Sequence, residues 1–246
     1  MKNTILILTL LSFNLSNSQE FSFPINENYN KIIKTLFEGE SVSDNECKWK
    51  LNVSDKFQFG AFDKDSLYTV CDTIFKFKVN DNLNTLLITS TYGKNETCHA
   101  CSPSLGIIQL EKNDEENKLI VKDFRKYITK YGTWGEPGKV SLLKIGENEF
   151  CIKVSSSYTG MGVSGDYDSL FYNGEKILTY TSYEDNSGST DEESRMFNYS
   201  TKISIDKSFK ITLKKIGTEI DEKTGKKIKV NTISNFILLD GELKKL

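Results

Sequence analysis

Apolar residues recur at every second position through most of the chain beyond Gly39. Because successive side chains of a β-strand point to opposite faces of a sheet, this spacing predicts strands. The predicted strands cover residues 57–59, 73–79, 86–90, 106–110, 118–121, 139–145 and 149–155. Short turns join them without intervening helices, so we expect a mainly β fold of antiparallel sheets arranged as a sandwich or barrel.

Two dipeptides with strong turn chemistry support this interpretation. Asn173-Gly174 interrupts the apolar run 169–178, and Asp240-Gly241 separates 236–239 from 242–243. Asn-Gly and Asp-Gly supply the positive φ angles of tight hairpin turns. The polar, acidic stretch 183–193 predicts a surface loop, and the lysine-rich stretch 218–229 predicts the tip of a long hairpin.

One N-terminal segment has the helical period instead. Its apolar residues are Ile25, Tyr29, Ile32, Ile33 and Leu36. Asn26 is a suitable N-terminal cap, and Gly39 suits the C-terminal end. We therefore expect a helix over about residues 26–38 that covers a face or an edge of a sheet.

The first 18 residues have the layout of a secretory signal peptide. Met1-Lys2-Asn3 is a short basic start, residues 4–13 are mostly apolar, and Ser16-Asn17-Ser18 is small and polar. The apolar run is too short to span a bilayer. We expect a mature chain that begins near Gln19 and is exported, to the periplasm or the medium. Residues 19–246 are then expected to form a single β-rich domain, with two sub-lobes as the alternative.

The net charge and the hydropathy of the chain limit the classes of partner that we expect. The formal net charge is −2, and apolar residues make up 37% of the chain, enough for a sizeable core. Without a strongly basic surface we expect no nucleic acid partner. No second apolar run of about 20 residues follows the leader, so we expect no membrane span after its removal. The expected partner is a protein or a small ligand.

Cys98-His99-Ala100-Cys101 is the most distinctive motif, because it contains two of the five cysteines and the only histidine. Its spacing is that of thiol oxidoreductases, but the following residues lead into a predicted strand at 106–110 rather than a helix whose N-terminus would stabilise a thiolate. We expect a structural disulfide that tightens the loop. Catalytic redox chemistry and metal binding with Cys47, Cys71 or His99 are the alternatives.

The remaining cysteines are Cys47, Cys71 and Cys151. Disulfides persist in exported proteins, and Cys47 and Cys71 are the natural second pair. Closing that loop of roughly 25 residues would contribute about 3.5 kcal/mol, against roughly 2 kcal/mol for the ring of Cys98 and Cys101. Cys151 is then the odd thiol, either on the less buried face of its strand or buried and inert.

Other motifs do not indicate a functional site, because the flanking residues lack the pattern that each site requires. Residues 160–165 match G-x-G-x-x-G, but no helix pattern follows, so we interpret them as a glycine-rich loop between strands. Residues 185–191 resemble a calcium loop only loosely, and we interpret them as a solvated loop. A single histidine leaves few general bases near neutral pH. We expect no catalytic residue, no cofactor and no metal site, and we name His99, Trp134 and Tyr158 as candidate binding residues.

The segment Cys-His-Ala-Cys-Ser-Pro-Ser-Leu-Gly, from Cys98 to Gly106, resembles a motif of uncharacterised exported bacterial proteins. Those proteins are similar again at Gly132-Thr133-Trp134-Gly135-Glu136 and after Tyr158-Thr159. The resemblance covers about the central third of the chain. It implies an exported bacterial protein and supplies no activity. Our leading hypothesis is a non-catalytic binding or interaction module. The alternative is a thiol-disulfide oxidoreductase that uses Cys98 and Cys101.

Overall fold

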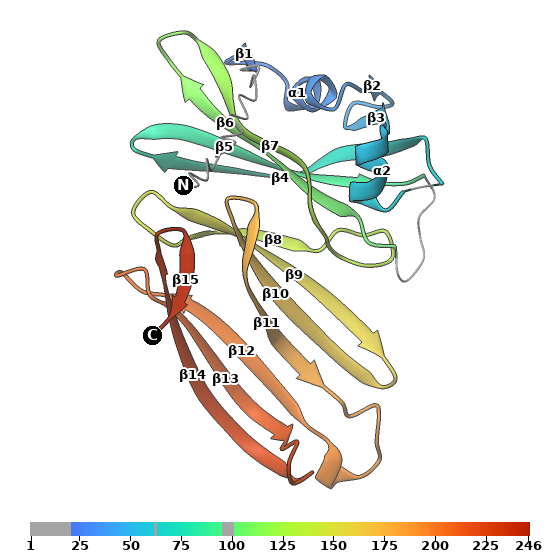
Figure 1. The fold of residues 1–246 in the computed structure, drawn as a ribbon, viewed down its shortest axis with the longest axis vertical. Helices are drawn as coiled ribbons and strands as arrows, with labels where there is room; N and C mark the ends of the chain where they lie inside the picture. The colour runs from blue at the N-terminus through green and yellow to red at the C-terminus, as the bar shows by residue number, and fades with distance from the viewer. Residues whose placement is uncertain (1–20, 62, 95–100) are drawn as a thin grey trace, which may run out of the picture.

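The computed structural model describes residues 21–61, 63–94 and 101–246, so the predicted leader lies outside the described residues. Within these residues the chain forms a seven-stranded and an eight-stranded sheet, both antiparallel (Figure 1). The prediction of a mainly β fold is confirmed. The two sheets contain nearly all of the alternating segments, because each predicted strand except 57–59 lies within an observed one or extends one residue beyond it.

The first sheet has the strand order β1-β7-β6-β5-β4-β3-β2. Its strands are β1 (Ser22–Pro24), β2 (Glu40–Ser41), β3 (Glu46–Lys50), β4 (Ser66–Val79), β5 (Asn82–Tyr92), β6 (Ser104–Asn113) and β7 (Lys118–Lys130). Strands β2 to β7 follow chain order, and β1 joins the far edge beside β7.

The second sheet is a meander in which every strand pairs with its neighbours in the chain. Its strands are β8 (Lys139–Lys144), β9 (Phe150–Gly160), β10 (Val163–Tyr172), β11 (Glu175–Asp185), β12 (Asn198–Ile205), β13 (Ile211–Ile220), β14 (Lys227–Leu239) and β15 (Glu242–Lys245). Pairing of β11 with β12 is confined to Tyr183–Asp185. The sheet folds along this short seam into a half-barrel (Figure 1).

Two helices cover the face of the first sheet that points away from the second. Helix α1 (Tyr29–Leu36) matches the predicted helix, but its N-terminal cap is Asn28, whose side chain accepts a hydrogen bond from the Asn30 backbone. The prediction of Asn26 as the cap is wrong. Ile32, Ile33 and Leu36 of this helix pack with Trp49 and Leu87 of the sheet in one core cluster.

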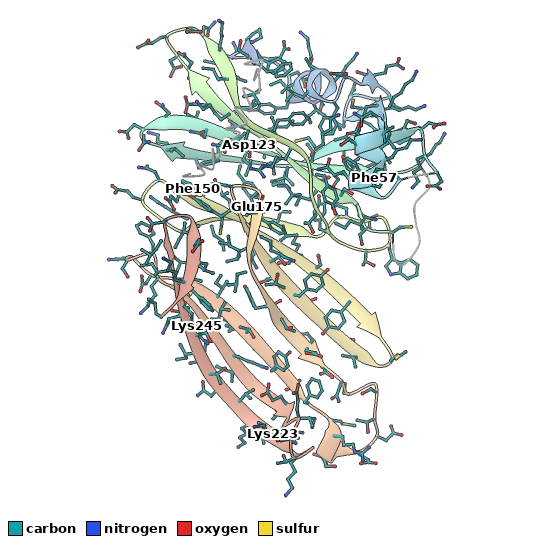
Figure 2. The ribbon with its side chains drawn as sticks, viewed as in Figure 1. Phe57, Asp123, Phe150, Glu175, Lys223 and Lys245 are labelled. Carbon is teal, nitrogen blue, oxygen red and sulfur yellow. The ribbon has the colours of Figure 1, made fainter. Side chains whose placement is uncertain are left out.

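The predicted strand at 57–59 is wrong, because these residues end helix α2 (Val53–Phe59). Asn52 and Asp55 form a capping box at its start, and Gly60 ends it in the left-handed conformation. These local signals outweigh the alternation of two phenylalanines: Phe59 is buried against Trp49, whereas Phe57 is 72% exposed (Figure 2).

A second core cluster joins the two sheets. Leu86, Ile88 and Ile107 of the first sheet pack with Ile152 and Phe171 of the second. Their neighbours in sequence, Leu87 and Ile108, belong to the helix-covered cluster instead. Strand β5 is therefore buried on both faces, and every residue from Asn84 to Thr91 is buried.

A third core cluster fills the closed end of the half-barrel. Cys151 and Leu170 pack there with Ile211, and Phe236 and Leu243 lie against them from β14 and β15. The inner face of the second sheet is thus apolar at one end, where the last two strands cross over towards the first four.

The predicted turns are confirmed. Asn173 and Gly174 have φ angles of 49° and 75°, and Asp240 and Gly241 have 53° and 81°. Residues 160–165 include the tip of the hairpin between β9 and β10, as predicted. The stretch 183–193 is a loop only beyond Asp185, where β11 ends, and the turn within 218–229 is confined to the residues between Ile220 and Lys227.

Candidate functional site

The segment that links the two sheets, residues 131–138, is held by several hydrogen bonds. We call it the Trp134 loop. Gly135 N donates to Cys101 O over 2.6 Å, Ser102 Oγ donates to Gly132 O over 2.7 Å, and Tyr131 N donates to Pro103 O over 3.0 Å. The structure therefore brings together two segments that the sequence singles out about 30 residues apart, the end of the cysteine motif and the tryptophan-bearing stretch.

The backbone of the Trp134 loop has a shape that few sequences adopt. Gly132 has a φ of 78°, and a Cβ there would collide with Glu136 O, so this position requires glycine. Trp134 itself has a φ of 57°, which is uncommon for a bulky residue, and its side chain is 55% exposed. Residues held in sparsely populated backbone conformations often cluster at functional sites.

A groove of about 480 Å³ lies beside this loop, on the inner face of the half-barrel. One wall is the Trp134 loop, through Thr133, Glu136 and Gly138. The floor is formed by side chains of β8 to β11, namely Lys139, Lys153, Ser155, Ser157, Asp166, Asp168, Ser182 and Tyr183. Its size is that of a small-molecule site, but its lining is dominated by hydroxyl and charged groups.

A charged cluster forms the floor of this groove. Lys153 Nζ lies 3.0 Å from Asp168 Oδ2, and the Tyr180 hydroxyl donates to the same oxygen over 2.8 Å. The strand register places the three side chains together. Asp168 stands opposite Tyr180 on β11 and opposite Ser155 on β9, and Lys153 is the next residue of β9 on the same face as Ser155. The Asp168 side chain is 7% exposed and that of Lys153 is 23% exposed. Burial and the hydrogen bond to Asp168 raise the pKa of Tyr180, so its hydroxyl remains a donor.

This cluster is unusual in its position. Cys151 and Leu170, the neighbours on the same inner face towards the closed end, are fully buried apolar residues. Removing a lysine and an aspartate from water costs several kcal/mol per ion, and their attraction repays this only with good geometry and further hydrogen bonds. The Lys153–Asp168 pair stands where further apolar residues would extend the core. Such a pair is weak evidence for stability, and it points to recognition of a ligand.

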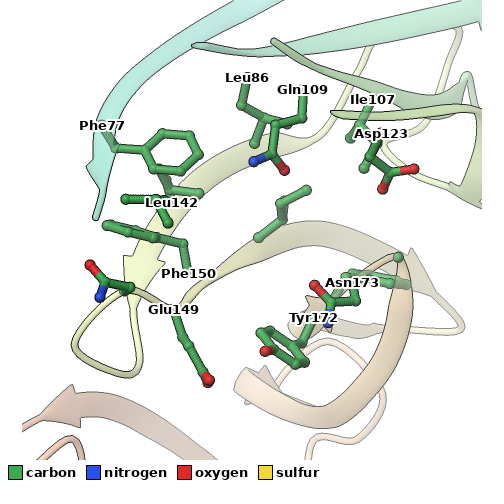
Figure 3. A pocket seen from close by; sticks show the side chains of 15 residues that line it. Phe77, Leu86, Ile107, Gln109, Asp123, Leu142, Glu149, Phe150, Tyr172 and Asn173 are labelled. Atoms are coloured by element: carbon green, nitrogen blue, oxygen red, sulfur yellow. The ribbon is translucent and has the colours of Figure 1, made fainter. Parts of the chain in front are cut away.

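A second hollow, of about 160 Å³, lies between the two sheets (Figure 3). Phe77, Leu86 and Ile107 line it from the first sheet, and Leu142 and Phe150 line it from the second. Asp123 lines it close to where the sheets approach one another, and there Arg125 Nη1 of the first sheet lies 3.8 Å from Glu175 Oε1 of the second (Figure 2). Most residues that line this inter-sheet pocket are apolar, and Gln109, Asp123, Asn148, Glu149 and Asn173 add polar groups to its lining.

The predicted bridge between Cys47 and Cys71 is not formed, because both thiols are free. Cys47 stands directly opposite Thr69, so Cys71 is its diagonal neighbour across the strand pair. Diagonal neighbours are about 7–8 Å apart, whereas a disulfide needs Cα atoms about 4.4–6.8 Å apart. Burial raises the pKa of both thiols, that of Cys71 to about 11.

The other described cysteines are Cys101, which is disulfide-bonded, and Cys151, which is a buried free thiol. Cys98 and His99 lie outside the described residues, so their pairing and binding roles stay predictions. Cys151 is fully buried, which resolves the two options that the sequence left open, and burial raises its pKa to about 12. A thiol of this kind is inert at neutral pH.

Tyr158, the third candidate binding residue, packs on Gly165 and Tyr167 near the tip of the β9–β10 hairpin. Burial and the nearby Glu184 carboxylate raise its pKa. Sequence reasoning missed Lys153, Asp168 and Tyr180. Their sequence signal is weak, because Lys153 and Asp168 occupy the polar positions of regularly alternating strands, where a solvent-exposed side chain is the ordinary expectation.

Two other kinds of feature are absent from the described part of the chain. No group of three or more metal-ligating side chains is found among residues 21–61, 63–94 and 101–246. Over the same ranges, no helix has the length and apolar character needed to cross a membrane.

Comparison with known proteins adds no family to this description. The sequence matches no known protein-family model, and neither a curated protein nor a solved structure is significantly similar to it.

Proposed function

We propose that this protein is an exported binding module without catalytic activity, and that it binds a small polar ligand in the groove of the half-barrel. The observation that carries the proposal is the Lys153–Asp168–Tyr180 cluster, a largely buried charged group on the floor of an open groove. The leader-like N-terminus supports export, and the absence of a basic composition supports a partner other than nucleic acid.

The cluster offers both kinds of hydrogen-bonding group to a ligand. A carboxylate accepts about four hydrogen bonds, so Asp168 retains acceptor capacity beyond its bonds to Lys153 and Tyr180. An ammonium donates three, and Lys153 uses Asp168 and the more distant Ser155 hydroxyl, at 3.4 Å. A ligand in the groove meets preformed donors and acceptors, which reduces the entropic cost of binding.

The charges lining the groove favour a ligand without large net charge. Lys139 and Lys153 are opposed by Glu136, Asp166 and Asp168, with hydroxyl groups between them. This mixture suits an uncharged polyhydroxy molecule or a zwitterion better than a strongly charged one. Curled antiparallel sheets commonly hold one small ligand on their inner face.

A ligand screen tests the proposal. Neutral monosaccharides, zwitterionic amino acids and short dipeptides are titrated into the mature chain and followed by amide NMR shifts. We expect at least one class to give saturable shifts at groove residues, and Asp168→Asn and Lys153→Met to weaken that binding. Lys202→Met, an exposed lysine on β12, is the matched control. Unchanged affinity in both groove variants, or no binding by any class, contradicts the proposal.

Export has its own test. Protein made with its leader should show a mature N-terminus close to Gln19 by mass spectrometry, and intact Met1 on exported protein contradicts it.

The alternative function, thiol-disulfide exchange, requires insulin-reduction activity that Cys101→Ser abolishes. We expect no such activity, because neither Cys101 nor the strand β6 that follows it provides a helix N-terminus.

A further inference from the structure

The inter-sheet pocket is a second hollow with a chemistry of its own, and it lies apart from the groove (Figure 3). Its walls come from both sheets, so its shape depends on how they pack. Phe77 and Phe150 face one another across the sheets, with ring centroids 4.6 Å apart and planes inclined by 49°. Leu86, Ile107 and Leu142 complete the apolar lining.

Two polar side chains of the first sheet, Gln109 and Asp123, line the pocket and are held by hydrogen-bonding or charged neighbours. Arg125 Nε lies 3.1 Å from Asp123 Oδ2. The Gln109 amide nitrogen donates to Asn84 Oδ1 over 3.0 Å, which leaves the Gln109 carbonyl oxygen as an acceptor. Gln109 and Asp123 of the first sheet therefore offer chiefly acceptors to a ligand inside, whereas the Glu149 carboxylate on the second sheet is turned away from them (Figure 3).

The edge of the pocket is also tied across the two sheets. Asn80, in the β4–β5 turn, and Asn148, in the β8–β9 turn, exchange two hydrogen bonds of 3.0 Å and 2.6 Å. A ligand that fills the pocket adds contacts to both sheets at once.

We propose that the inter-sheet pocket binds a small aromatic molecule carrying one hydroxyl or N–H donor, of the size of phenol. The volume sets the size, because an apolar cavity of about 150 Å³ holds a single benzene ring. The two phenylalanines favour an aromatic ring through edge-to-face or offset contacts. The acceptors Gln109 and Asp123 favour a donor at one end of the ligand.

Titration of the mature chain with phenol, followed by amide NMR shifts, tests this site. Toluene is the matched probe, since it has the same shape without the donor. We expect saturable shifts at the pocket residues with a Kd on the order of 1 mM for phenol, and weaker binding of toluene. Gln109→Met, which keeps the side-chain length and removes the acceptor, should bring phenol affinity down towards that of toluene.

Filling the pocket should abolish binding. Leu142→Phe and Val79→Phe add bulk from opposite sheets, and Val79 lies at a strand end where the added volume is more easily accommodated. We expect the phenol affinity of each of these two variants that still folds to fall by about tenfold or more. Ile233→Phe, at a position on β14 that is 60% exposed, is the control of equal size change.

Three results overturn the proposal: no saturable shift up to about 10 mM phenol, unchanged affinity in the folded filling variants, or toluene binding as tightly as phenol. The groove is tested separately, because Asp168→Asn should leave phenol binding unchanged. Phenol binding that Asp168→Asn abolishes would place the probe in the groove and overturn the assignment to the inter-sheet pocket.

Discussion

The two sheets solve the same packing problem in different ways. The first sheet is covered on one face by α1 and α2 and on the other by the second sheet, so its central strand β5 is buried on both faces. The second sheet packs against the first through one face of β9 and β10, and its other, inner face is buried and apolar at the closed end and charged where the groove opens. A sheet folded on itself therefore leaves room for a charged groove beside its core, which the layered sheet does not.

The buried polar groups make the same distinction. In the first sheet, Trp49 Nε1 donates to Thr69 Oγ1, which also bonds Thr91 Oγ1, and the chain of hydrogen bonds stays inside the core. In the second sheet, Lys153 and Asp168 meet at the floor of an open groove. The buried hydrogen bonds of Trp49 and Thr69 fix how the core of the first sheet packs, whereas the Lys153–Asp168 pair of the second sheet remains available to a ligand.

The largest effect is expected in the layered sheet. Trp49→Ala removes a side chain that is 1% exposed, and we expect unfolding free energy to fall by about 3–5 kcal/mol through the lost burial and the cavity. Trp134→Ala, the only other tryptophan, should change it by about 0.5 kcal/mol or less. Urea denaturation measures both. Equal losses in the two variants would remove the contrast between covered and open regions.

A smaller loss is expected from breaking the charged cluster. Asp168→Ala leaves Lys153 without its carboxylate, and because the lysine is partly exposed we expect a loss of about 1–3 kcal/mol. The double variant Lys153→Met/Asp168→Leu should recover most of this, since it replaces the pair by apolar groups. If the double variant is as unstable as the single one, the pair contributes to stability and our distinction between the sheets weakens.

Alkaline pH should act on the closed end of the half-barrel. Burial raises the pKa of Cys151 from 9.0 to about 12, so the folded state favours the protonated thiol. That stabilisation is fully present below pH 9 and is lost as pH rises towards 12, by about 2 kcal/mol between pH 9 and 11. Cys151→Ala should show a correspondingly shallower decline in chemical denaturation. Parallel declines in the two proteins would argue against a buried thiol at this position.

The smallest effect concerns the helix that covers the first sheet. Asn28→Ala removes the cap of α1, a hydrogen bond of 2.8 Å to Asn30 N, and we expect a loss of about 1 kcal/mol. Asn26→Ala is the control, because Asn26 is exposed and does not cap the helix. Thermal unfolding of the two variants compares them directly. A larger loss from Asn26→Ala would return the cap to the residue that the sequence suggested.

Local sequence patterns were enough to predict most of the strands, their turns and the class of fold. Alternation in β4 and β9 shows which residues share a face, and Asn173-Gly174 and Asp240-Gly241 fix hairpins because their positive φ angles are local properties. Helix α2 was missed although its signals, Asn52, Asp55 and Gly60, are also local. Alternation of two phenylalanines was too short a pattern to decide between a strand and a helix turn.

The groove and the inter-sheet pocket could not be predicted from local patterns, because each is built from segments far apart in the chain. Strand register, invisible in one sequence, places Asp168 beside Lys153 and keeps Cys47 opposite Thr69 rather than Cys71. The fold of the second sheet at its short seam leaves Lys153 and Asp168 in a groove rather than in a core. The contact of Gly135 with Cys101 arises for the same reason: pairing and curvature are properties of whole sheets, which local patterns do not specify.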